Sequence, residues 1–186
     1  MGLRHPCRRQ KLAAMKRACQ QSGFTLFELM ITIGLGAVLI GLAAPSIANF
    51  TRASRIAASS RDLVTDFAFA RNEAVMRAQR VSVCTSANLT SCANSSWGQG
   101  RLVFVDGGTA GTIDGTDLVL LRPPVLDSSI VTSSLGIATS HFVSFLPNGR
   151  LTGTGLVSLC SPNQKLRRVA LQRTGQAGLT RTTIAC

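Results

Sequence analysis

The apolar segment formed by residues 24–44 most strongly limits how this chain can fold, because these 21 residues contain a single charged side chain, Glu28. A helix rises about 1.5 Å per residue, so this stretch would cover roughly 30 Å, the thickness of the hydrocarbon core of a bilayer. A lone carboxylate in such a helix is costly unless it has a partner. The sequence therefore predicts a transmembrane helix over residues 24–45 in which Glu28 is paired.

Basic residues are concentrated before this apolar segment. Six of the 20 lysines and arginines, and none of the eight acids, lie in residues 1–23. Positive charge marks the cytoplasmic side of a membrane helix, so the C-terminal part is expected outside the cytoplasm. A secretory signal peptide is disfavoured, because its apolar run is shorter and because the small residues Ala43-Ala44 are followed by Pro45.

The junction at Gly23-Phe24-Thr25-Leu26-Phe27-Glu28 resembles a type IV prepilin signal. The resemblance implies removal of a leader, residues 1–23, by prepilin peptidase, N-methylation of Phe24, and retention in the inner membrane until assembly. It also implies that Glu28 pairs with the new terminal amine of Phe24, in its own chain or in a neighbouring subunit. The charges support such a pair, since the cut creates a cation within one turn of the carboxylate. An uncut signal-anchor helix is the alternative, and Met15 offers a second start that gives a shorter leader.

Four of the six cysteines lie in the expected exported part: Cys84, Cys92, Cys160 and Cys186. An even number of cysteines in an oxidising compartment favours disulfides. Cys84 and Cys92 flank a short polar loop, whereas Cys160 ends an apolar run and Cys186 is the last residue. We therefore predict the pairs Cys84–Cys92 and Cys160–Cys186.

Residues 46–80 change to an amphipathic pattern with charged residues between apolar ones. The apolar positions recur at helical intervals, which predicts a stem helix with one side against a sheet. The residues expected on that side are Ile47, Phe50, Ala57, Val64, Phe67, Ala74 and Val75.

Residues 81–186 have the composition of a β-rich globular domain, with glycine, threonine and serine between short apolar runs. Strands are predicted at residues 80–85, 101–105, 117–122, 141–145, 156–160, 167–172 and 182–185, with a weaker one at 130–132. The expected fold class is α+β, with a long N-terminal helix, half transmembrane and half amphipathic, packed on an antiparallel β domain.

Further segments resemble the FimT/GspH family of minor pilins and pseudopilins. They are Asp66-Phe67-Ala68-Phe69-Ala70-Arg71-Asn72-Glu73-Ala74-Val75 leading to Val81-Ser82-Val83-Cys84, Trp97-Gly98-Gln99-Gly100-Arg101-Leu102-Val103-Phe104-Val105-Asp106, Ser144-Phe145-Leu146-Pro147-Asn148-Gly149-Arg150, and Leu159-Cys160. The resemblance covers most of the chain after residue 23 and implies a pilin-like fold.

The family resemblance also implies a function. The chain would be a minor pilin of a type IV pilus, inserted among other pilins at or near the filament tip, with its C-terminal domain in the periplasm and then at the cell surface. The alternative is a minor pseudopilin of a type II secretion system with a purely structural role.

The sequence does not indicate a catalytic site or a metal site. Outside the leader the chain has one histidine, His141, and no tyrosine, and no histidine pairs with a cysteine or an acid in a recognisable motif. The loop from Asp106 to Asp117 lacks the alternating ligands of a calcium loop, so a hairpin with an Asp114-Gly115 turn is the better interpretation. We expect no enzyme activity, no metal and no cofactor.

The last 22 residues contain basic side chains and no acid: Lys165, Arg167, Arg168, Arg173 and Arg181. Such a patch is typical of a phosphate-binding surface, which predicts contact with double-stranded DNA, although a solvated strand face is an equal alternative. The resemblance argues both ways, because DNA-binding members of the family carry a Gly-Arg-x-Arg segment where this chain has Gly175-Gln176-Ala177-Gly178.

Overall fold

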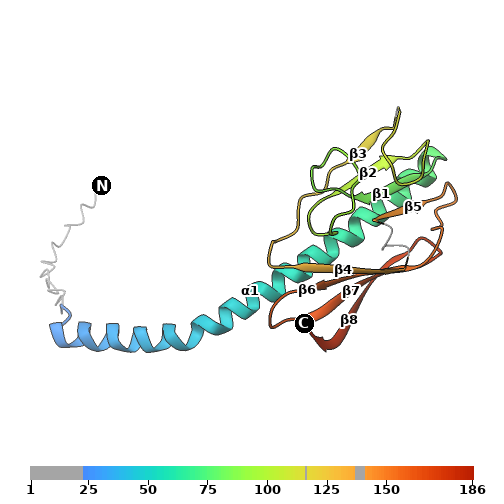
Figure 1. Cartoon of the computed structure of the whole chain (residues 1–186). Coiled ribbons are helices and arrows are strands. Elements are labelled where there is room, and N and C mark those ends of the chain that lie inside the picture. The colour runs from blue at the N-terminus through green and yellow to red at the C-terminus, as the bar shows by residue number, and fades with distance from the viewer. Residues whose placement is uncertain (1–22, 116, 137–140) are drawn as a thin grey trace, which may run out of the picture. The chain divides into compact units, whose positions relative to one another are not determined.

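The computed structural model describes residues 23–115, 117–136 and 141–186 (Figure 1). For residues 42–45 it describes the backbone only. Except for Gly23, the predicted leader lies outside the described residues. Within them, one helix, α1 (Leu26–Arg77), precedes all the strands. The strands are β1 (Val81–Thr85), β2 (Arg101–Val105), β3 (Val119–Leu121), β4 (Val131–Gly136), β5 (Phe142–Phe145), β6 (Gly155–Cys160), β7 (Lys165–Leu171) and β8 (Ala177–Ala185).

The strands form two antiparallel sheets of four strands each. The first has the order β3-β2-β1-β5 and the second the order β4-β6-β7-β8. Every predicted strand is present, and the α+β, pilin-like fold class is confirmed. The largest difference is β8, which begins at Ala177 rather than at residue 182. It begins earlier because Ala177 already pairs with Leu171 across a tight turn, in which Gly175 has a φ of 83°.

Helix α1 ends at Arg77 rather than at the predicted residue 80. Ala78 adopts a left-handed conformation with a φ of 52°, its N–H donates to the carbonyl oxygen of Val75 at 3.3 Å, and the N–H of Gln79 donates to that of Ala74 at 3.3 Å. These two bonds define a Schellman cap. The sequence carries no signal for this end, because the left-handed position holds alanine instead of the usual glycine.

The buried face of α1 is rotated from the predicted one. Phe67 and Ala74 are buried as predicted, but Ile47, Phe50 and Val75 are 61%, 74% and 51% exposed. Burial begins only at Ile56, because the sheets do not extend to the earlier turns. The apolar residues of α1 that are buried in the core are Ile56, Leu63, Phe67, Ala70 and Ala74, and Val64, also predicted, packs against the core while partly exposed.

The main hydrophobic core is built from residues of α1 and of both sheets. Strands β1, β2 and β5 contribute Val83, Val103 and Phe145 to this core, and the second sheet contributes Val157 and Val169. Because both sheets bury side chains against the same helix, α1 from Ile56 onward is the shared support of the two sheets.

Two compact units divide between Leu42 and Ala43, so the amphipathic part of α1 belongs to the same unit as the sheets. By length and apolar content, no single helix among the described residues qualifies as a membrane span. The helical stretches Leu26–Gly41 and Ser46–Arg77 qualify only as an interrupted pair. The transmembrane segment 24–45 therefore stays a prediction.

Candidate functional site

The predicted processing site lies immediately before the helix. Gly23, Phe24 and Thr25 are not helical, and Phe24 is 81% exposed. The hydroxyl of Thr25 accepts a hydrogen bond from the N–H of Glu28 at 3.2 Å, which makes Thr25 the N-cap of α1. The sequence signal for this cap is the Thr-x-x-Glu spacing of a capping box, here Thr25 to Glu28. The peptide between Gly23 and Phe24 therefore lies outside the helix, in an exposed part of the chain.

Glu28 lies in the first turn of α1, where a negative charge is favourable to the helix dipole. It makes no salt bridge within residues 23–115, 117–136 and 141–186. In the uncut chain the nitrogen of Phe24 is an uncharged peptide nitrogen. The pairing of Glu28 with a terminal amine thus stays a prediction for the processed chain.

The internal segments that carry the family resemblance meet on one side of α1. The guanidinium of Arg101 reaches Asp66, with its Nε donating to Oδ2 at 2.9 Å. The rings of Phe67 and Trp97 lie 5.5 Å apart. These contacts join the segment of α1 from Asp66 to the segment that begins at Trp97.

The third segment reaches the same helix through a glycine. Arg71 donates from Nε to the carbonyl oxygen of Gly149 at 3.0 Å. Gly149 has a φ of 73°, and a Cβ placed there would lie 3.0 Å from the Val75 side chain. These contacts attach β2 of the first sheet and the loop between β5 and β6 to α1.

The Asp66–Arg101 pair is the most buried ion pair among the described residues. Arg101 has no exposed side-chain surface, and its Nη2 lies 2.7 Å from Asp66 Oδ2. Arg101 also donates from Nη1 to the carbonyl oxygen of Trp97 at 3.0 Å. Burial raises the pKa of Asp66 above its ordinary value, and the neighbouring Arg101 opposes that rise. Sequence reasoning missed this pair because Arg101 appeared to be one residue of an ordinary strand.

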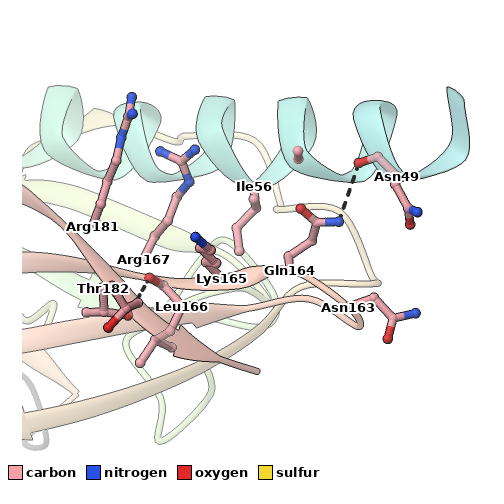
Figure 2. A pocket seen from close by; sticks show the side chains of 11 residues that line it. Asn49, Ile56, Asn163, Gln164, Lys165, Leu166, Arg167, Arg181 and Thr182 are labelled. Atoms are coloured by element: carbon pink, nitrogen blue, oxygen red, sulfur yellow. Dashed lines mark hydrogen bonds between the residues drawn. The ribbon is translucent and has the colours of Figure 1, made fainter. Parts of the chain in front are cut away.

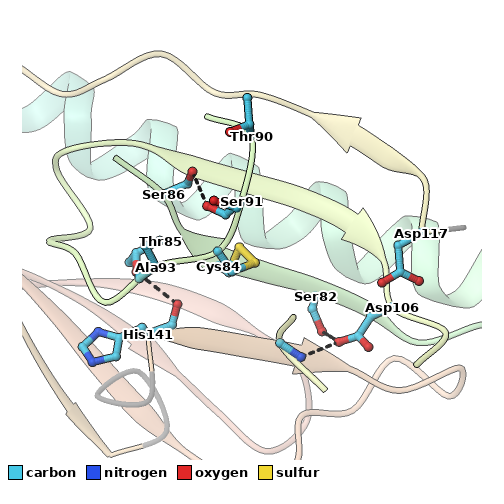
Figure 3. Close-up of a disulfide and its surroundings, with 12 residues drawn as sticks. Ser82, Cys84, Thr85, Ser86, Thr90, Ser91, Ala93, Asp106, Asp117 and His141 are labelled. Carbon is cyan, nitrogen blue, oxygen red and sulfur yellow. Dashed lines mark hydrogen bonds between the residues drawn. A yellow bond between two sulfur atoms is a disulfide. The ribbon is translucent and has the colours of Figure 1, made fainter. Parts of the chain in front are cut away.

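Asp106 organises the loop that follows β2 (Figure 3). Its carboxylate pairs with Arg80 Nη2 at 2.8 Å, accepts the N–H of Gly111 at 2.8 Å, and accepts the hydroxyl of Ser82. Asp114 and Asp117 also accept backbone N–H groups, and Gly115 has a φ of 54°. Strands β2 and β3 pair as a hairpin across this loop. The carboxylates thus serve the loop's own backbone, in line with the predicted turn at Asp114-Gly115.

Both predicted disulfides are present in the structure. Cys84, in β1, is joined to Cys92 with the Cα atoms 5.6 Å apart (Figure 3). Asn88 holds the intervening loop by accepting the N–H groups of Thr90 and Ser91, each at 3.0 Å. Cys160 is joined to Cys186 with the Cα atoms 5.4 Å apart, which attaches the end of β8 to the end of β6.

Removal of the longer disulfide, by Cys160→Ser with Cys186→Ser, is expected to lower the free energy of unfolding by about 3 kcal/mol. Its cysteines are 26 residues apart, so the bond restricts the unfolded chain more than the bond across 8 residues between Cys84 and Cys92. The matched variant without the shorter bond should lose about 1 kcal/mol less. Urea unfolding of the full chain, followed by Trp97 fluorescence, measures both losses. Peptide mapping without reductant that joins Cys84 to Cys160 would contradict the pairing.

The five basic residues predicted to contact DNA do not share one face. Arg167 lies directly opposite Arg181 in the β7–β8 register, whereas Arg168 lies opposite Thr180. Side chains alternate along a strand, so Arg168 points to the other side of the sheet. Figure 2 shows Arg167 and Arg181 pointing from the hairpin toward α1.

Lys165 begins β7, and it lines the same pocket as Arg167 and Arg181. Arg173 lies in the turn beyond Leu171, where its carbonyl oxygen accepts the N–H of Leu151 at 3.1 Å. The basic patch is therefore divided into three places, and only Lys165, Arg167 and Arg181 remain together.

A long helix preceded by a short, exposed non-helical segment and packed on two antiparallel sheets defines a pilin-like protein. The model of the family described as type II transport protein GspH matches residues 59–175, and the chain belongs to this family. The model of the prokaryotic N-terminal methylation motif matches residues 19–44. No match was found among curated proteins.

Solved structures of similar fold come from both kinds of system. The type IV minor pilin FimU of Pseudomonas aeruginosa has a TM-score of 0.56 at 16% identity, over 72% of this chain and 97% of that one. The minor pseudopilin EpsH of the Vibrio cholerae type II secretion system has a TM-score of 0.50 at 12% identity, over 72% and 99%. At these identities the likeness concerns the fold alone. The chain is thus a member of a family of minor pilins and pseudopilins.

Proposed function

We propose that this chain is a minor pilin of a type IV pilus. In this proposal prepilin peptidase cuts after Gly23, residues 24–45 hold the protein in the inner membrane in a single pass, and residues 81–186 form a domain in the periplasm. The chain then enters the filament at or near its tip and supports assembly with other pilins. The observation that carries the proposal is the match to the methylation motif over residues 19–44, whose Gly23-Phe24 junction is exposed and non-helical and precedes a capped helix.

The second candidate is a minor pseudopilin of a type II secretion system, with a role in assembly alone. The family description and the EpsH likeness favour it. The pattern of four cysteines and the Ala70-Arg71-Asn72-Glu73-Ala74 segment favour the pilus. Both candidates are structural roles without catalysis, and both use the same stem.

Deletion of the gene is expected to reduce surface pili strongly and to leave the secretion of folded enzymes unchanged. The reason is that a minor pilin near the tip acts at the start of filament assembly. The measurement compares sheared pili and secreted protein in the deletion strain with those in a strain complemented by the wild-type chain. The mature chain should be found in the sheared pilus fraction. Normal piliation together with lost secretion would replace the pilus role by the pseudopilin role.

The predicted contact with double-stranded DNA has less support than the structural role. Contact with duplex DNA gains strength from several basic side chains on one surface, because each neutralised phosphate releases counterions. Here the five candidates are divided among two strand faces and a turn. The divided basic residues therefore do not favour duplex DNA as a ligand of this chain.

A further inference from the structure

A pocket lies between α1 and the start of the β7–β8 hairpin (Figure 2). Its volume is about 720 Å³, within the range of small-molecule sites. Asn49, Ala53 and Ile56 line it from the helix, and Lys165, Arg167 and Arg181 line it from the hairpin. The amide of Gln164 donates to the carbonyl oxygen of Asn49 at 3.4 Å, which links the two walls. The pocket therefore has a helical wall without charge and a strand wall with three cations.

The positive charge in this pocket is not neutralised by the protein. No acid lines the pocket, and Lys165, Arg167 and Arg181 form no salt bridge among the described parts of the chain. Side chains directly opposite each other in an antiparallel pair have Cβ atoms about 5 Å apart, and like charges there are destabilising. Arg167 and Arg181 occupy such positions.

The electrostatics of Arg167 agree with this geometry. Its pKa is lowered from the ordinary value, first by burial, then by the charge of Arg181, and then by that of Arg61 on α1. An anion between the guanidinium groups would remove the repulsion and accept charge-assisted hydrogen bonds from both.

The position of the pocket in the chain indicates where that anion comes from. Asn49 and Ala53 follow the end of the apolar segment at residue 44 by five and nine residues, which in a helix is about 8–14 Å. The surface of an anionic membrane attracts basic groups placed this close to a membrane helix. A duplex would instead need phosphates along an open surface, and Arg168 and Arg173 do not extend this one.

We propose that the pocket between α1 and the β7–β8 hairpin binds the phosphate of an anionic phospholipid headgroup, held by Arg167 and Arg181 with Lys165 beside them. The inference rests on the membrane anchoring in the proposed function. Bound in this way, the headgroup would hold the hairpin and the adjoining part of α1 at the membrane surface before assembly.

Native mass spectrometry of the full chain in a neutral detergent tests the proposal with phosphatidylglycerol as the probe. The wild-type chain should retain phosphatidylglycerol in preference to zwitterionic phosphatidylcholine. Arg167→Gln with Arg181→Gln should weaken phosphatidylglycerol binding by about tenfold or more, since two charge-assisted hydrogen bonds are lost. Arg168→Gln is the matched control on the other face of β7 and should change binding by less than about twofold.

Further measurements distinguish loss of the lipid site from unfolding of the protein, and lipid binding from binding of other anions. Arg181→Lys keeps the charge and should keep most of the preference, and Trp97 fluorescence checks that each variant is folded. Equal binding by the Gln double variant, or no preference for phosphatidylglycerol, would overturn the proposal. So would inorganic phosphate or duplex DNA binding that depends on Arg167 and Arg181 as strongly as the lipid does. Cleavage after Gly23, measured on the same samples, reports on the proposed function separately, so its failure is distinguishable from failure of the lipid site.

Discussion

Arg101→Met is expected to lower the free energy of unfolding by about 3–5 kcal/mol, because it leaves the Asp66 carboxylate buried without its partner. Arg101 is fully buried, contacts Asp66 through Nε and Nη2, and also donates to the carbonyl oxygen of Trp97. Urea unfolding of the full chain in detergent micelles, followed by Trp97 fluorescence, measures the loss. Arg77→Met is a matched control, since Arg77 forms an exposed pair with Glu73 and should cost less than about 1 kcal/mol.

The loss of stability caused by Arg101→Met should increase as the pH rises. The pKa of Asp66 is raised from the ordinary 3.8, chiefly by burial, while Arg101 lowers it. A carboxyl with a raised folded-state pKa contributes most to stability when it is protonated, and this contribution is lost as the pH rises through that pKa. Removing Arg101 raises the pKa further, so the difference between variant and wild type should be largest near about pH 7.5 and smaller near about pH 5.

Removing both charges separates the effect of the unpaired Asp66 carboxylate from the effect of lost packing around Arg101. Asp66→Leu with Arg101→Met leaves no buried charge, so this double variant should recover most of the stability lost in Arg101→Met. A double variant as unstable as Arg101→Met, or a pH-independent loss, would mean that packing of the Arg101 side chain decides the stability and that the charge of Asp66 does not.

Gly23→Val is expected to abolish processing and, with it, incorporation into filaments. Mass spectrometry of the wild-type chain from membranes should find an N-terminus at methylated Phe24, whereas the variant should keep residues 1–23. In the structure a Cβ at Gly23 meets nothing within 4 Å, so the chain itself accommodates a larger side chain. A block would therefore come from the peptidase, which must accept the residue before the cut.

Two controls accompany this change. Gly23→Ala should still be cut, because methyl is the smallest addition. Thr25→Ala removes the N-cap of α1 and should weaken the start of the helix by about 1 kcal/mol while leaving the Gly23-Phe24 junction in place. An intact leader on the wild-type chain in cells with active peptidase would end the pilin hypothesis altogether.

The sequence by itself determined the features that depend on neighbouring residues. The apolar run, the Gly23-Phe24 junction with Glu28 and the positions of short β runs are local patterns, and they were sufficient for the α+β fold and the family. The cysteine pairs could also be proposed, because each pair flanks a loop or ends a strand.

Only the tertiary structure decided which distant residues meet. Asp66 and Arg101 are 35 residues apart, and no local pattern distinguishes Arg101 from an exposed strand residue. The strand register likewise placed Arg167 opposite Arg181 and turned Arg168 away. Of the five basic residues near the C-terminus, only three therefore line one pocket. The end of α1 at Arg77 had no sequence signal, since Ala78, the left-handed residue that follows, is of a type that seldom takes this conformation. Contacts of this kind depend on how strands and helix pack, and a one-residue change of register would reverse the face of every side chain.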